Sequence, residues 1–371
     1  MTPIRVLIVD DSVVIRRLLS DVLSSDPAIE VVGTASNGRI GLDRIRQLSP
    51  DLVTLDIEMP ELDGLATLVE LRREFPRLPV IMFSTLTERG ASATIEALAS
   101  GANDYVTKPA NVGSTQAAIA KVRDDLIPKV KALTGRSPSA PPAPRRAAAT
   151  ADGRAVSTPD RRRSRERVSV IGIGTSTGGP NALERVLPLL PHDLGVPIAI
   201  VQHMPPMFTR LLAERLDTKC ALHVVEATDG QTVQPGTVYL APGGLHLEIV
   251  RGPGALSVTR LTEDPPENFC RPAVDVLFRS LVGSYGAGTL GLVMTGMGHD
   301  GLAGAREIVD HGGQMLVQDE ATSVVWGMPG FVARDGIADE VLPLDSIAPA
   351  LERRVRAGQR LGTPVGTAVG S

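Results

Sequence analysis

Short apolar runs alternate with amphipathic segments along the first third of the chain. The apolar runs that predict buried strands are 4–9, 29–34, 52–55, 80–83 and 104–106. The segments whose apolar residues recur at helical spacing are 13–24, 39–48, 65–74, 89–99 and a last one ending near 133. Strands that alternate with helices in this way form a parallel sheet covered on both faces. We therefore predict a doubly wound α/β domain of the flavodoxin-like type, with ligands at the carboxyl ends of its strands.

The same alternation returns after residue 168. A continuous apolar run at 168–174 enters a glycine-rich turn, and a helix is predicted from about 181 to 190. Further buried strands are predicted at 197–202 and 289–295. This pattern predicts a second α/β doubly wound domain with a mainly parallel sheet.

The segment between the two patterned regions is different in composition. Residues 1–133 carry a net charge of −3 and residues 168–371 a net charge of −7, whereas 134–167 carry +6 and are rich in Pro, Ala and Arg. We interpret 134–167 as a semi-extended linker between domains at 1–133 and 168–355. A basic arm for nucleic acid or an anionic membrane is the alternative reading. Residues 356–371 are expected to form a flexible tail.

Composition narrows the possible functions. Apolar residues make up 43% of the 371 residues, and no apolar run is long enough to cross a membrane. The chain enters its first strand without a signal peptide, so we expect a cytoplasmic protein with no membrane insertion. Two cysteines rule out a disulfide scaffold and a cysteine-built zinc site. An aromatic content of 3% and a net charge of −4 argue against nucleic-acid binding.

Chemically active side chains follow the predicted strands of the first domain. These residues are Asp10, Asp11, Asp56, Ser84, Tyr105 and Lys108. Three carboxylates that meet at one sheet edge favour a hard cation with oxygen ligands, and Mg²⁺ fits best. A carboxylate beside Mg²⁺ and a lysine ammonium is suited to accept a phosphoryl group. Taken alone, the two adjacent aspartates could simply cap the following helix.

The first domain resembles a response-regulator receiver domain. The motifs that match are Val9-Asp10-Asp11-Ser12, Leu55-Asp56-Ile57-Glu58-Met59-Pro60, Ser84 and Lys108-Pro109. The resemblance implies that Asp56 is phosphorylated and that Asp10, Asp11, Asp56 and the Glu58 carbonyl hold Mg²⁺. It also implies that Ser84 and Lys108 bind the phosphoryl group, that Tyr105 is the rotameric switch, and that a histidine kinase is the phosphodonor.

The glycine-rich turn of the second domain has three readings. It does not fit dinucleotide binding, because Thr177 stands where the third glycine of GxGxxG belongs and His203 follows the next strand in place of an acid. Residues 174–178 read Gly-Thr-Ser-Thr-Gly, which matches the GxSxG turn that exposes a nucleophilic serine. Ser176 could also be an ordinary helix cap.

The positions of two further residues favour the nucleophile. His203 follows the next predicted strand and Asp300 follows the strand at 289–295, so parallel pairing would bring both to the edge that carries Ser176. A serine needs a base, and the imidazole needs a carboxylate to orient it. His299 adjoins Asp300 and is the main rival base, ahead of the imidazoles at 192 and 311. The order Ser–His–Asp differs from that of α/β-hydrolases.

The second domain is similar to the catalytic domain of chemotaxis protein-glutamate methylesterases. The motifs that carry the resemblance are 173–179, Gln202-His203-Met204-Pro205-Pro206, 239–243, 271–278, 295–301 and 327–329. They imply Ser176 as nucleophile, His203 as base, Asp300 as its orienting group, the Met297 N–H in the oxyanion hole and Thr177 in the site lining. The resemblance also implies that the esterase needs no cofactor. Cys270 is interpreted as a small core thiol.

Two functional hypotheses follow. The first is a phosphorylation-regulated serine hydrolase that removes glutamyl methyl esters from methyl-accepting chemotaxis receptors, with glutamine deamidation as a second activity. The second is a phosphorylated signalling module whose hydrolase fold is vestigial. The presence of Ser176, His203 and Asp300 together favours the first, and the chain is expected to be a monomer.

Overall fold

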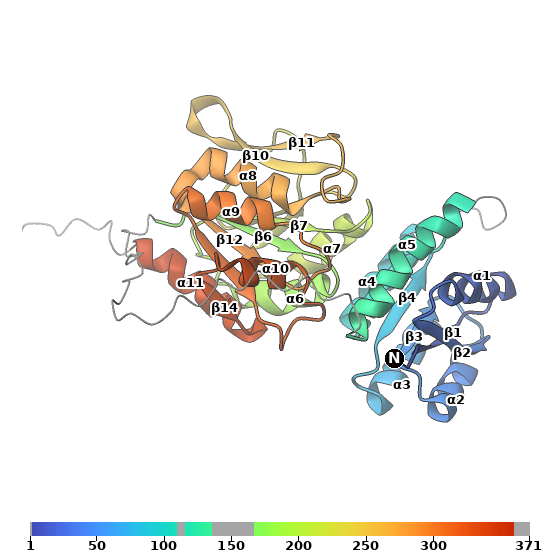
Figure 1. Ribbon diagram of the computed structural model, residues 1–371. Coiled ribbons are helices and arrows are strands. Elements are labelled where there is room, and N and C mark those ends of the chain that lie inside the picture. The colour runs from blue at the N-terminus through green and yellow to red at the C-terminus, as the bar shows by residue number, and fades with distance from the viewer. Residues whose placement is uncertain (1, 110–115, 136–166, 360–371) are drawn as a thin grey trace, which may run out of the picture.

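The computed structural model describes residues 2–109, 116–135 and 167–359, which form two units side by side (Figure 1). The helices and strands of the first unit lie between Ile4 and Leu133, and those of the second between Val170 and Gln359. Most of the predicted linker, 134–167, and of the predicted tail, 356–371, lies outside the described residues. Helix α11 (Leu344–Gln359) includes the first four residues of that predicted tail.

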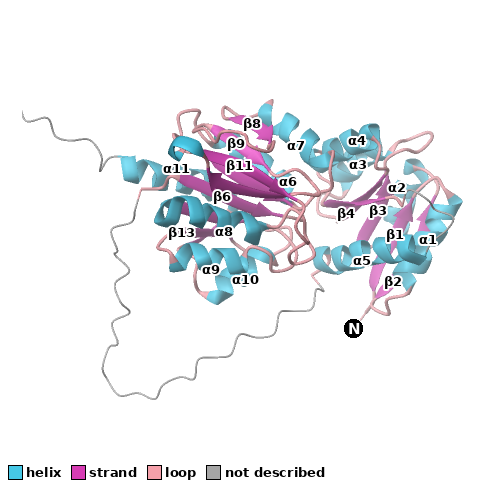
Figure 2. Ribbon diagram, turned by 90° about the horizontal axis from the view of Figure 1, so that it is seen from above, coloured by secondary structure: helices cyan, strands magenta, loops and turns pink. Residues whose placement is uncertain are grey.

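The first unit is a five-stranded parallel sheet in the order β2-β1-β3-β4-β5. Its elements are β1 (Ile4–Val9), α1 (Val13–Ser24), β2 (Ile29–Ala35), α2 (Gly38–Leu48), β3 (Leu52–Asp56), α3 (Gly64–Glu74), β4 (Val80–Ser84), α4 (Glu88–Ala99), β5 (Asp104–Thr107) and α5 (Gln116–Leu133). Helices cover both faces of the sheet (Figure 2). This is the predicted doubly wound, flavodoxin-like arrangement.

Local sequence explains why the helices of the first unit begin where they do. Ser12, Asn37, Asp63 and Thr87 each accept a hydrogen bond from the backbone N–H three residues later. Each therefore satisfies one of the donors that a helix start leaves unpaired. Strands β1, β3 and β4 consist almost wholly of buried residues, as expected of a sheet that is covered on both faces, whereas the edge strand β2 buries only its two end residues.

The second unit is built on a seven-stranded parallel sheet in the order β14-β13-β12-β6-β7-β9-β8. Its strands are β6 (Val170–Thr175), β7 (Ile198–Gln202), β8 (His223–Glu226), β9 (Thr237–Leu240), β12 (Thr289–Val293), β13 (Gln314–Gln318) and β14 (Glu340–Leu342). Its other helices are α6 (Gly179–Val186), α7 (Phe208–Asp217), α8 (Val274–Tyr285), α9 (Leu302–Asp310) and α10 (Met328–Asp335). A separate antiparallel hairpin, β10 (His246–Arg251) with β11 (Ser257–Thr262), packs against α8. The predicted doubly wound class is confirmed.

The ends of strands β3 and β4 and of helix α6 differ from the predicted ends. Strands β3 and β4 run one residue further than predicted, so Asp56 and Ser84 are the last residues of their strands. Helix α6 ends at Val186, before the predicted end, and continues as a 3₁₀ turn over Leu187–Leu189. Pro188 has no N–H to donate to the preceding helical turn, which explains the early end.

The two units meet through the α4 side of the first and the α6–α7 side of the second. Figure 2 shows the strands of the larger sheet directing their carboxyl ends toward the first unit. One buried apolar cluster runs across the junction and includes Leu98 and Tyr105 from one side and Leu183 and Phe208 from the other. No helix within the described ranges has the length and apolar character to span a bilayer.

Candidate active site

The order of three parallel strands brings the candidate catalytic residues to one edge of the larger sheet. β6 lies between β7 and β12, with parallel pairing on both sides. Ser176 follows the last residue of β6, His203 follows the last residue of β7, and Asp300 lies in the loop after β12. The carboxyl edge predicted from sequence is therefore the edge at which these residues gather.

The chain turns sharply at Ser176. The Ser176 N–H donates to the Thr295 carbonyl at 3.0 Å, which ties the turn to the end of β12. Gly178 has φ +77°, a conformation that favours glycine. Gly296 permits the close approach of the two chains, since a Cβ there would lie 2.8 Å from the Ser176 Cβ. The glycines therefore set the geometry of the turn.

His203 and Asp300 form a direct pair. The distance from His203 Nε2 to Asp300 Oδ2 is 2.8 Å. The same carboxylate accepts N–H donors from Val274 (2.7 Å) and Asp275 (3.1 Å), which open helix α8. Burial raises the pKa of Asp300, but His203 and these N–H groups outweigh it and lower the pKa below its usual value. Asp300 is thus held as a carboxylate that can orient the imidazole.

The rival base lies elsewhere. The His299 side chain is exposed and its ring meets Phe331 edge-on at 5.8 Å, while the Asp300 carboxylate bonds His203. The Met297 N–H donates no hydrogen bond to any part of the chain that the structure describes. Its place in the oxyanion hole, which the family resemblance implies, stays a prediction. Thr177 is buried beside Ser176.

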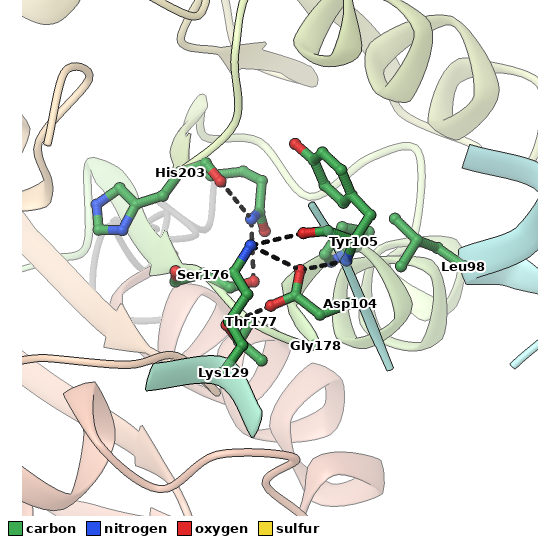
Figure 3. Close-up of a pocket in the computed structure, with 10 residues that line it drawn as sticks. Leu98, Asp104, Tyr105, Lys129, Ser176, Thr177, Gly178 and His203 are labelled. Carbon is green, nitrogen blue, oxygen red and sulfur yellow. Dashed lines mark hydrogen bonds and ion pairs between the residues drawn. The ribbon is translucent and has the colours of Figure 1, made fainter. Parts of the chain in front are cut away.

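Ser176 Oγ makes no hydrogen bond to the His203 ring within the described residues. The free ring nitrogen, Nδ1, instead lies 3.6 Å from the Cys270 Sγ. Ser176 and His203 line one pocket, as Figure 3 shows. The structure therefore assembles two members of the predicted triad and places the third beside them without its proton-transfer contact. Such contacts are often completed only when substrate binds.

The interpretation of Cys270 as a core thiol is wrong. Its side chain is half-buried and touches the imidazole, because the turn that carries it folds over His203. Burial lowers the pKa of His203, but the hydrogen bond to Asp300 and the contact with Cys270 outweigh it and raise the pKa to about 10. These two contacts therefore favour the charged form of the imidazole.

Two positioning residues were missed by sequence reasoning. The Gln202 amide donates to the carbonyls of Ser176 (3.0 Å) and His203 (3.3 Å), and its oxygen accepts from Thr175 Oγ1 (2.7 Å). Asn268 donates to Asp300 Oδ1 at 3.0 Å. The sequence did contain a signal for Gln202, because an amide at the end of an apolar strand is expected to need hydrogen-bond partners. Nothing local marked Asn268, because it meets Asp300 from a distant loop.

The first unit gathers its own acidic cluster. Ligand oxygens of Asp10, Asp11 and Asp56 all lie within 4.8 Å of one another. Lys108 Nζ lies 2.8 Å from Asp56 Oδ1 and 3.0 Å from Asp10 Oδ2. Burial and the neighbouring Asp10 charge raise the pKa of Asp56 to about 6, although Lys108 opposes the shift. The buried Asp56 Oδ2 accepts no hydrogen bond from the described residues. This set of oxygen donors fits Mg²⁺.

The three other predicted residues of the first unit, Ser84, Glu58 and Tyr105, each contact a different part of the structure. The Ser84 hydroxyl donates to the Gly90 carbonyl at 3.0 Å and accepts from Thr94 at 2.7 Å, so it is engaged with α4. The Glu58 N–H points to Asp56 Oδ1 at 3.4 Å. Tyr105 is buried at the junction, where its ring stacks on Phe208 at 4.8 Å.

The first unit closes over the candidate nucleophile (Figure 3). Thr177 Oγ1 donates to Asp104 Oδ2 at 2.6 Å, and the Asn181 amide donates to the Ala102 carbonyl at 3.2 Å. Lys129 Nζ lies 3.6 Å from Asp104 Oδ1 and donates to the Tyr105 carbonyl at 2.6 Å. The pocket left between the units, lined by Ser176, His203 and residues of the first unit, has a volume of about 40 Å³. That space suits a water or two and excludes a protein side chain.

Comparison with known proteins identifies the family of this chain. The sequence matches the family described as CheB methylesterase over residues 171–351 and the response regulator receiver domain over 6–120. A protein-glutamate methylesterase/protein-glutamine glutaminase of Nocardioides sp. is 54% identical across 99% of both chains. One of the same name from Trichodesmium erythraeum is 49% identical, covering 96% of this chain and all of its own.

A solved structure, the CheB methylesterase catalytic domain of Thermotoga maritima, is 41% identical and covers 50% of this chain and 98% of its own, with a TM-score of 0.49. The two full-length relatives settle the family. The chain belongs to the CheB methylesterase family, with a response regulator receiver domain ahead of the esterase domain.

Proposed function

We propose that this chain is a phosphorylation-regulated serine hydrolase that demethylates glutamyl methyl esters, and deamidates glutamines, on methyl-accepting chemotaxis receptors. The 2.8 Å contact between His203 and Asp300 beside Ser176 is the observation that carries the proposal. The curated relatives are named for both activities. An imidazole that a carboxylate orients next to a serine at the sheet edge is the arrangement that a working serine hydrolase needs, which favours the enzyme over a vestigial fold.

The reaction follows acyl-transfer chemistry. Ser176 Oγ attacks the ester carbonyl while His203 takes its proton, and the Met297 N–H stabilises the resulting oxyanion. The tetrahedral intermediate collapses to a glutamyl-serine ester, and His203 returns the proton to the departing methoxide as methanol. Water, activated by His203, then releases glutamate. With a glutamine substrate the leaving group is ammonia. Asp300 orients the imidazole and stabilises its charged form throughout.

The receiver unit controls access to this site. Asp10, Asp11, Asp56 and the Glu58 carbonyl would hold Mg²⁺, which neutralises charge on the phosphoryl group during transfer. Asp56 accepts that group from a chemotaxis histidine kinase, and Lys108 pairs with it. Ser84 leaves the Gly90 carbonyl to bond the phosphoryl oxygen, which frees space for Tyr105 to rotate away from Phe208. Losing that stacking contact weakens docking and opens the site.

The proposed organisation assigns 1–133 to regulation, 134–167 to the connection and 168–355 to catalysis. The enzyme acts in the cytoplasm, where its two free thiols match a reducing environment, and it acts as a monomer.

Substitution of the three catalytic residues should separate their roles. Ser176→Ala should reduce methanol release from methylated receptor by on the order of 10⁴-fold or more, because the nucleophile is lost. His203→Ala should be nearly as damaging, Asp300→Ala less so, and His299→Ala mild. A folded Ser176→Ala protein that releases methanol at the wild-type rate would contradict the triad. If His299→Ala lost as much activity as His203→Ala, the assignment of His203 as the base would be wrong.

The Cys270 contact should appear in the pH dependence. Only the neutral imidazole accepts the serine proton, so the rate of ester hydrolysis should rise with pH. The midpoint of this rise should lie above about 6.5, the ordinary pKa of histidine. Cys270→Ala removes one cause of the raised pKa of His203. It should therefore move the rising limb of the profile to lower pH, whereas Cys220→Ala, at the other free thiol, should not. Superimposable profiles for wild type and Cys270→Ala would show that the contact does not tune the base.

Phosphorylation should be confined to Asp56 and should require Mg²⁺. A small acyl phosphate should label the wild-type chain once, as measured by intact mass, and chelation of the metal should prevent labelling. Asp56→Asn should abolish it, since the amide cannot attack phosphorus. Asp43→Asn, on the exposed face of α2, is the matched control. Mg²⁺-dependent labelling of Asp56→Asn would mean that another side chain is the acceptor.

Weakening the docked contact should activate the unphosphorylated enzyme. Asp104→Ala removes the acceptor for the Thr177 hydroxyl without touching a catalytic group. A loss of about 1–3 kcal/mol in docking free energy raises the open fraction roughly 5–150-fold. We expect faster methanol release from Asp104→Ala and from a fragment that begins near Arg167 than from the unphosphorylated whole chain, with Asp43→Ala unchanged. Equal rates for all four proteins would rule out inhibition by the receiver.

A further inference from the structure

A tight turn beside the candidate catalytic centre presents an aromatic ring to solvent. The Glu267 N–H donates to the Cys270 carbonyl at 3.1 Å, and the Cys270 N–H donates to the Glu267 carbonyl at 2.9 Å. These two bonds close a loop whose central residues are Asn268 and Phe269. Both have positive φ, +52° and +64° respectively, the pattern of a type I′ turn.

The fold does not explain Phe269. Asparagine tolerates the left-handed region, but a bulky side chain there is an outlier, and glycine is favoured at the second position of such a turn. The Phe269 side chain is 103% exposed, so no burial offsets the unfavourable backbone. A strained residue whose side chain packs against nothing points to a role outside folding.

The turn is fixed rigidly to the catalytic groups. Asn268 bonds Asp300 Oδ1 at 3.0 Å and Asp275 Oδ2 at 2.9 Å. Glu267 forms a two-pronged ion pair with Arg279 on α8. The next residue, Cys270, touches the His203 ring. The ring of Phe269 is therefore held at a set place on the rim of the site, and it stays exposed with the receiver docked.

We propose that Phe269 is a substrate-binding residue that packs against apolar side chains next to the glutamyl ester of the protein substrate. This rests on the proposed function. The turn that carries Phe269 bonds Asp300 through Asn268 and touches His203 through Cys270. A chain whose ester reaches these groups passes beside this turn, so the occupant we infer is the chain being demethylated. Rigid, exposed aromatic rings supply much of the binding free energy at protein contacts. The docked receiver leaves the ring uncovered, but the closed pocket of about 40 Å³ excludes the glutamyl side chain, so Phe269 contributes to productive binding once the receiver has moved.

The test replaces Phe269 with glycine in the full chain. Glycine adopts positive φ freely, so Phe269→Gly should fold and melt within a few degrees of wild type. Leu189→Ala is the matched control, an apolar residue 61% exposed on the 3₁₀ turn after α6, at the far end of that helix from the site. For methylated receptor, KM should rise about tenfold in Phe269→Gly while kcat stays near wild type. Leu189→Ala should change neither constant.

Binding measured without turnover separates this inference from the proposed function. In a Ser176→Ala background, Phe269→Gly should weaken the affinity for methylated receptor about tenfold. An unchanged Kd would overturn the role of Phe269 even if the wild type releases methanol. A fall in kcat with KM unchanged would also overturn it, because the turn would then act through Asp300 and His203. A wild-type dimer that Phe269→Gly dissociates would identify a second copy as the occupant and overturn the inference. Failure of the wild type to release methanol would refute the proposed function and the inference together.

Discussion

Parallel pairing of β6 with β7 and β12 is the constraint on which the site depends. All three strands run in the same direction, so residues that follow their carboxyl ends lie at the same edge of the sheet. Strand order alone therefore brings together three residues that are far apart in the sequence. The glycines at 178 and 296 then let the backbone close to the distance that a nucleophile turn requires. The start of α8 meets the same edge and donates two N–H groups to Asp300, so a helix end stabilises the carboxylate that the strands deliver.

Strand β5 connects the acidic cluster of the receiver to the surface that docks on the esterase unit. Lys108 follows the carboxyl end of β5 and contacts the acidic cluster, whereas Asp104 at its amino end binds Thr177. Four residues of extended chain span roughly 13 Å. A change at the phosphorylation site therefore lies one strand length from the docked surface, and Tyr105, next to Asp104 on that strand, contacts both α7 and Lys129. The predicted switch residue, Tyr105, therefore lies between the phosphorylation site and the docked surface.

Sequence patterning predicted the elements and the sheet edges because both depend on local periodicity and strand direction. Ser176, His203 and Asp300 were found because each follows a recognisable buried strand. The contacts of Cys270 and Asn268 were not predictable, since they depend on how a turn folds over a neighbouring loop. The engagement of Ser84 with α4, and the face that Tyr105 presents to Phe208, likewise depend on packing between elements that no local pattern specifies. The predicted roles of the site residues stay predictions until the variants are measured.

The hydrogen bond between Thr177 and Asp104 has a consequence for how the enzyme responds to its signal. Asp104 and Lys129 both belong to the first unit, so their ion pair stays intact when the two units separate. Docking covers this pair of charges, and the loss of their hydration costs free energy that the Thr177 bond and the apolar cluster must offset. The net free energy that holds the junction is reduced by this cost, which brings the closed and open forms closer in free energy. The activity then depends on the time-averaged fraction of open molecules, which can follow the supply of phosphoryl groups in both directions.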